Sequence, residues 1–146
     1  MQYKIAALTE IAVRGRTHIP RSGYSKDIIY VPEAESATRL AQQLCQLAKG
    51  SALLTGRATV AEEDYQLIQR AAFDSMPPAR AKILNALIVG QSLNDISLPA
   101  STRTYALQEL EAQGLIAKDA RGRWILSTLT LEHLTLAGYD CCSPNR

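Results

Sequence analysis

The side chains best suited to bind another molecule lie between Ser101 and Arg123. Adjacent hydroxyls on Ser101 and Thr102 open a helical stretch, and Lys118 and Arg121 belong with Arg123 to a short basic turn. Lysine and arginine contact phosphate oxygens, while hydroxyl side chains in the first turn of a helix reach phosphates or base edges. This chemistry predicts non-catalytic contacts to phosphates and base edges. The expected contact residues are Ser101, Thr102, Arg103, Tyr105, Lys118, Arg121 and Arg123.

The helical stretch has an inward and an outward side. At about 100° per residue, Leu107 and Leu110 fall on one side and are expected to face a core. Tyr105 and Glu109 point away from it. Because carboxylates repel phosphate, Glu109 and Glu111 should limit close approach to DNA to about the first turn and a half of this helix.

Several cations have two interpretations. Arg103 either reads a base edge or folds its stem against the preceding helix, with its charge near Asp95. Four further cations either contact phosphate or belong to a solvated surface loop: Arg14, Arg16, Arg21 and Lys26. The sequence leaves both questions open.

Helix breakers and capping residues predict the elements that carry the expected contacts. Ile83–Ile88 hold the apolar stripe of one helix, which Gly90 can end. Ser92 and Asp95 resemble a capping box at the start of a short helix. Pro99 disfavours a helical residue before it, so the chain must turn there before the next helix begins.

The segment that follows resembles a known fold. Gly114 supplies a left-handed helix end, and residues 115–116 are expected to pair with residues 124–126 in a small hairpin. The stretch LPASTRTYALQELEAQGLIAKDARGRWIL resembles the recognition helix and wing of bacterial winged-helix proteins. The shared features are Ser101–Thr102, Leu107, Leu110, Gly114–Ile116 and the basic tip at residues 119–123. The resemblance covers residues 76–128 and implies a helix that enters the major groove, although winged helices also serve as protein-binding modules.

The first half predicts three helices and one long irregular segment. Residues 1–13 carry one apolar side, residues 14–35 contain four helix breakers, and residues 36–54 form a broad apolar face that includes Leu53–Leu54. Cys45 is expected to be a small core residue. Thr59 and Glu62 predict a capping box for the third helix. The uncapped start at Met1 predicts that the chain begins inside a longer protein.

Residues 36–75 resemble the helical lid of AAA+ ATPases. The shared features are Leu53–Leu54, Gly56–Arg57, Thr59–Val60 and Glu62–Asp64. Several such ATPases carry a winged helix directly after the lid, so the resemblance implies either a C-terminal fragment of a larger AAA+-like ATPase or a separate protein with the same module. The sequence contains no phosphate-binding loop, and we expect this chain neither to bind nor to hydrolyse ATP.

Composition sets further limits. The 146 residues are 47% hydrophobic, and we expect a lid-like module at residues 1–75 and a winged-helix domain with a tail at residues 76–146. The net charge is only +2, so any affinity for DNA must come from a local cluster of cations. Three cysteines, among them Cys141 and Cys142, lack metal spacing. We expect no catalytic, metal or cofactor site, and a cytoplasmic protein that does not enter membranes.

The sequence therefore predicts a mainly α fold: a helical lid-like module followed by a winged helix-turn-helix with a small β-hairpin wing. The leading function is non-catalytic, regulatory DNA binding. The alternative is a protein-interaction or dimerisation module, acting as a homo-oligomer or within a parent ATPase assembly. Thr130–Gly138 fit either a last helix or a strand.

Overall fold

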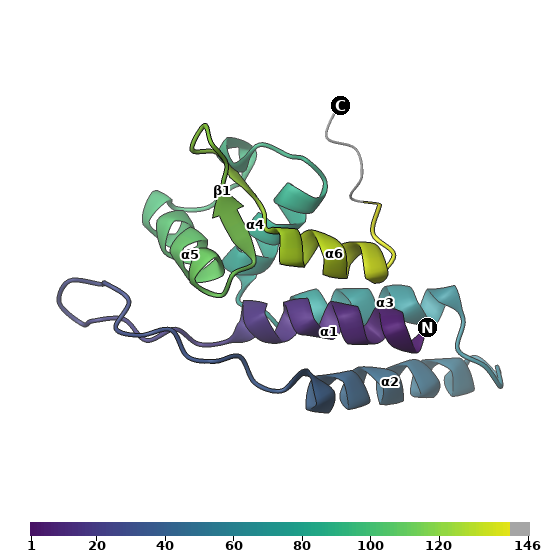
Figure 1. Ribbon diagram of the computed structural model, residues 1–146. Coiled ribbons are helices and arrows are strands. Elements are labelled where there is room, and N and C mark those ends of the chain that lie inside the picture. Colours follow the sequence, from purple (N-terminus) through teal and green to yellow (C-terminus); the bar gives the residue numbers. More distant parts are fainter. Residues whose placement is uncertain (141–146) are drawn as a thin grey trace.

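The computed structural model describes residues 1–140. Cys141, Cys142 and the rest of the expected tail lie outside the described residues. The described chain is mainly helical with a small two-stranded hairpin near its end, as the sequence predicts (Figure 1). Among the helices of residues 1–140, none combines the length and the apolarity that a membrane span requires.

The first half contributes three packed helices: α1 (Gln2–Arg16), α2 (Ala37–Leu54) and α3 (Glu62–Asp74). Helix α1 lies against both others, and Figure 1 shows the three below the second half of the chain. Helix α1 runs three residues beyond the expected Val13 because the Thr17 amide still reaches the Val13 carbonyl, at 3.2 Å. Arg14 and Arg16 are also favourable in a last helical turn, where the backbone dipole is negative.

The second half has the expected order of elements. Helix α4 (Pro78–Ile88) is followed by the 3₁₀ turn η1 (Leu93–Asp95), helix α5 (Ala100–Ala112) and strands β1 (Ile116–Lys118) and β2 (Trp124–Leu126). The strands are antiparallel, with Ile116 opposite Leu126 and Lys118 opposite Trp124. The last segment forms helix α6 (Thr128–Leu136), which packs on α1, so the helical alternative is correct.

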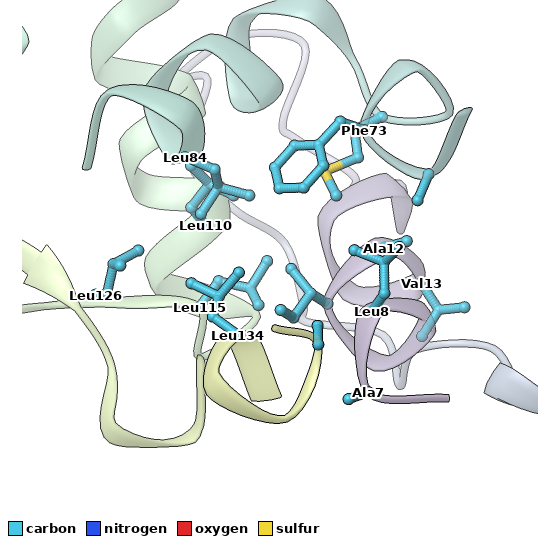
Figure 2. Packing of buried hydrophobic residues seen from close by; sticks show 14 of the residues in the cluster. Ala7, Leu8, Ala12, Val13, Phe73, Leu84, Leu110, Leu115, Leu126 and Leu134 are labelled. Atoms are coloured by element: carbon cyan, nitrogen blue, oxygen red, sulfur yellow. The ribbon is translucent and has the colours of Figure 1, made fainter. Parts of the chain in front are cut away.

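One hydrophobic core runs through both halves. The fully buried leucines come from both halves of the chain: Leu8 of α1, Leu84 of α4, Leu110 of α5, Leu115 just before β1 and Leu134 of α6 (Figure 2). Their side chains meet between α1, α4, α5 and α6. The core therefore fixes α5 and the hairpin relative to the first three helices.

The expected burial of Leu53–Leu54 is wrong. These side chains are 73% and 91% exposed. The buried residues of α2 follow each other every four positions, at 40, 44, 48 and 52, and form one stripe. Leu53 and Leu54 lie beside that stripe in the last turn.

The expected capping box at Thr59 and Glu62 is also wrong. Helix α3 has Ala61 at its N-cap, and the Asp64 carboxylate accepts a hydrogen bond from the Ala61 amide at 2.8 Å. Arg57 holds the same carboxylate from the other side, at 2.7 and 2.9 Å. The Arg57 ion pair places Asp64 at the helix start, while Glu62 remains exposed.

Candidate nucleic-acid interface

The first turn of α5 is exposed. Pro99 occupies the N-cap, and no side chain caps the helix. Ser101 and Thr102 are both exposed on this turn, as the sequence predicts. Uncapped amides at a helix N-terminus favour anions, because the backbone dipole is positive there. Hydroxyls and amides are thus available together at this end of α5.

Arg103 turns back toward the segment before α5. Its Nη2 donates to the carbonyls of Ile96, at 3.1 Å, and Leu98, at 3.5 Å. Arg103 is therefore folded back against the preceding segment, as the second of its two interpretations predicts. Its partners, however, are backbone carbonyls and not the Asp95 carboxylate. The guanidinium stabilises the turn that presents the first residues of α5.

Tyr105 is only 37% exposed, because another part of the chain lies over it. The Arg21 guanidinium stacks 4.7 Å from the centre of the Tyr105 ring, and its Nη2 donates to the Tyr105 carbonyl at 3.0 Å. On the side of α5 where Tyr105 is expected to be free, its ring is covered by Arg21.

Glu109 is not the exposed repulsive charge that the sequence predicts. Its carboxylate forms ion pairs with Arg21 and Arg80, each at 2.8 Å, and its side chain is 17% exposed. Two guanidinium groups offset this single negative charge. Glu111 remains exposed.

The last turn of α1 and the long segment after it do not consist of solvated cations alone. Arg14 donates to the Gln113 carbonyl at 3.4 Å, Arg16 pairs with Glu35, and Arg21 holds α5. Arg21 and its α5 partners are 84 to 88 positions apart. Because no local pattern connects such distant residues, the sequence gives no signal for the role of Arg21.

The hairpin tip is organised by Asp119. One of its carboxylate oxygens accepts from the amides of Arg121 and Arg123, both at 2.8 Å, and the other accepts from Arg123 Nε at 2.8 Å. The Arg123 amide, with the Arg123 guanidinium and the Arg121 amide, holds the pKa of Asp119 below its ordinary value. The tip is therefore fixed, and the Arg123 side chain remains 69% exposed.

The three cations of the hairpin differ in their surroundings. The Lys118 ammonium lies 4.6 Å from the centre of the Trp124 ring, and Arg123 is paired to Asp119. The exposed Arg121 side chain forms no ion pair within residues 1–140. Arg121 is thus the cation that a phosphate could approach with the least rearrangement.

The expected contact residues lie on two elements, the first half of α5 and the hairpin (Figure 1), but Arg103 is folded back and Tyr105 is covered by Arg21. Residues 1–140 contain no group of three acidic, histidine or cysteine side chains that could hold a metal ion. The chain matches no known family model, no curated protein and no solved structure.

Proposed function

We propose that the chain is a non-catalytic, cytoplasmic DNA-binding protein of the winged-helix type. In this proposal the first turn of α5 enters the major groove, and the hairpin is a wing on the phosphate backbone. The observation that carries the proposal is the exposed, uncapped start of α5, together with the hairpin that follows α5 and leaves Arg121 and Arg123 exposed to solvent. The order α4, η1, α5 and hairpin supports it.

The resemblance of residues 36–75 to an AAA+ lid extends the proposal. The packing of α2 on α3 gives these residues a compact helical form directly before α4. We assign the chain a regulatory role, or the role of the DNA-engaging end of a larger AAA+-like ATPase. The chain itself contains no phosphate-binding loop.

Binding to DNA is tested by its salt dependence. A labelled duplex is titrated with the chain at several salt concentrations, and fluorescence anisotropy gives the affinity. Because few cations contribute, the slope of log affinity against log salt should be about −2 to −4. Arg121→Ala with Arg123→Ala should make the slope shallower by nearly one unit per lost phosphate contact, on the order of 0.9 each.

A matched control removes two exposed cations from elsewhere in the fold. Lys49 on α2 and Arg70 on α3 carry the same total charge as the two wing arginines. Lys49→Ala with Arg70→Ala should leave the slope nearly unchanged. Equal effects of the two double changes, or no duplex binding even at low salt, would refute the proposed function.

A protein-interaction module is the second candidate. It is favoured by exposed apolar side chains outside α5 and the hairpin: Ile29, Tyr30 and Val31 after α1, and Leu53 and Leu54 at the end of α2. Contiguous exposed apolar groups are typical of protein contacts. If a second copy covers Ile29 and Tyr30, sedimentation equilibrium should show a dimer, and Ile29→Ser with Tyr30→Ser should abolish it. A monomer at all concentrations would exclude this dimer.

A further inference from the structure

Residues 17–36, here called the arm, leave the end of α1 and project beside α5 before they reach α2 (Figure 1). The arm folds back on itself through three backbone hydrogen bonds. The Ser22 amide donates to the Asp27 carbonyl at 2.9 Å, the Lys26 amide to the Ser22 carbonyl at 3.1 Å, and the Ile29 amide to the Pro20 carbonyl at 3.0 Å. The Ser22 hydroxyl also accepts from the amides of Tyr24 and Ser25, each at 3.3 Å. The tip, residues 22–26, therefore has a defined shape.

Arg21 fastens the arm to the outward side of α5. Its Nε donates to the Glu109 carboxylate at 2.8 Å, its Nη1 to the Gln108 side chain at 3.0 Å, and its Nη2 to the Tyr105 carbonyl at 3.0 Å. The same Nη1 donates to the Lys26 carbonyl at 2.8 Å, which ties the tip to this anchor. Arg21 thus ties the tip to α5, and the Gln113 side chain at the C-cap of α5 holds the arm a second time by donating to the Pro32 carbonyl at 3.1 Å.

The anchor lies on the same side of α5 as the proposed groove contacts. Ser101, Tyr105 and Gln108 are separated by four and three positions, so they form one stripe along the helix. At about 1.5 Å per residue, Gln108 lies roughly 10 Å along the axis from Ser101. The major groove is only about 12 Å wide, so a duplex that receives Ser101 has a phosphate strand close to the arm.

The tip of the arm presents side chains that can bind a phosphate strand. The arm as a whole holds Arg21 and Lys26 against Asp27, Glu33 and Glu35, but the tip at residues 22–26 contains Lys26 and no acidic residue. At the tip Lys26 is exposed and Tyr24 is 100% exposed. The nearest carboxylate of α5, Glu109, is already paired with Arg21 and Arg80. Lysine ammonium and tyrosine hydroxyl groups both bind phosphate oxygens.

We infer that the arm is a third DNA-contacting element, which places Lys26 and Tyr24 on the phosphate strand beside the groove that α5 enters. This inference rests on the proposed function and adds a partner surface that lies outside the winged-helix unit. Arg21 is a positioning residue in it, because its side chain holds the tip and does not itself touch DNA.

The test uses the full chain and the duplex titration described above. Lys26→Gln with Tyr24→Ala should reduce the affinity for the duplex several-fold. The slope of log affinity against log salt should become shallower by about 0.9, the value expected for the loss of one phosphate contact. The melting temperature should stay unchanged, because both side chains are exposed. The matched control is Lys49→Gln with Tyr3→Ala, which removes an equally charged lysine and an 87% exposed tyrosine from other elements.

Arg21→Ala provides the second measurement. If Arg21 only positions the tip, its removal should cost as much affinity as the two tip changes, and combining all three should cost little more. Fully additive losses in the combined variant would overturn the positioning role. A circular dichroism melt identifies whether the variant is folded, and the tip variant alone still decides the inference if it is not.

The outcomes separate this inference from the proposed function. Tip changes without effect, in a chain that still responds to Arg121→Ala with Arg123→Ala, overturn the arm contact and leave the proposed function standing. Tighter binding on loss of the tip would show that the arm covers α5 and would also overturn the inference. Absence of any duplex binding overturns both.

Discussion

The hydroxyl of Tyr65 donates a hydrogen bond to the carbonyl of Ala137, with 2.6 Å between the two oxygens. Tyr65 lies in α3, whereas Ala137 is the C-cap residue of α6, so this bond joins the first half of the chain to its last helix. Tyr65 is 1% exposed and Ala137 is fully buried. Burial raises the pKa of Tyr65 above its ordinary value, so the hydroxyl keeps its proton and remains a donor.

Tyr65→Phe should therefore destabilise the fold by about 1–3 kcal/mol, because the Ala137 carbonyl would lose its side-chain donor in a buried place. Urea unfolding followed by circular dichroism measures this difference. The matched change Tyr24→Phe removes the same oxygen from a fully exposed ring and should stay within about 0.5 kcal/mol. Equal midpoints for the two variants would contradict the structural role of this bond.

Asp64 should make stability depend on acid pH. The Ser51 side chain, the Ala61 amide and the Arg57 guanidinium lower the pKa of Asp64 from 3.8 to about 2. Because the folded pKa lies below the unfolded one, the stabilisation is complete above about pH 4 and is lost as the pH falls toward 2. Asp64→Asn should lower the melting temperature at pH 7 and show a smaller further decrease between these two pH values.

The control for this titration is Asp74→Asn at the exposed end of α3. Its melting curve should keep the pH dependence of the parent chain. If the melting temperature of Asp64→Asn falls as steeply with acid pH as that of the parent chain, the ion pair of Arg57 and Asp64 is not the source of the expected pH dependence.

The secondary structure could largely be predicted from the sequence because its signals are local. Pro99 and Gly114 bound α5, and Ser92 caps η1 through a side-chain bond to the Asn94 amide, at 3.3 Å. The choice between helix and strand for the last segment stayed open, because only nine residues form α6 and leucine fits both.

The chemistry of the candidate interface was less predictable. The sequence predicts that Glu109 points outward, but its carboxylate is only partly exposed and is neutralised by Arg21 and Arg80, which lie 88 and 29 positions earlier. Helical periodicity predicts the face of a helix on which a side chain lies, but it does not predict which residues of another segment contact that face. The arm and its anchor could therefore be found only in the folded chain.

Two glycines should respond in opposite directions to the same substitution. Gly114 has a φ of +73°, and the amides after α5 bond back to Glu111 and Leu110, at 2.9 Å each, in the pattern of a left-handed helix end. Gly114→Ala should cost about 1 kcal/mol, because this conformation strains a β-carbon. Gly50 lies inside α2 with open space around its α-carbon, so Gly50→Ala should stabilise by about 0.5–1 kcal/mol. Thermal melts of both variants test the two signs, and a shift in the same direction would contradict this account.

Arg80 should be the most sensitive charged residue of the fold. Its side chain is 5% exposed and pairs with Glu109 at 2.8 Å, and its Nη1 donates to the carbonyls of Gly15, at 2.9 Å, and Thr17, at 2.7 Å. Arg80→Ala should cost about 3–5 kcal/mol, because it leaves a carboxylate with one partner fewer and two carbonyls at the end of α1 without their donor. Glu109→Gln should cost less, because an amide oxygen can still accept from Arg80.

The two changes should not add. Once Arg80 is removed, the Glu109 carboxylate has only Arg21 as an ion-pair partner, so replacing that carboxylate by an amide costs less. Arg80→Ala with Glu109→Gln should therefore destabilise the fold by less than the sum of the single changes. Urea unfolding of the parent, both single variants and the double variant gives the coupling free energy, expected at about 0.5–3 kcal/mol. Purely additive losses would mean that Arg80 acts only through the Gly15 and Thr17 carbonyls. Glu109 would then owe its position to Arg21, whose bonds to the Gln108 side chain and the Tyr105 carbonyl hold the arm in either case.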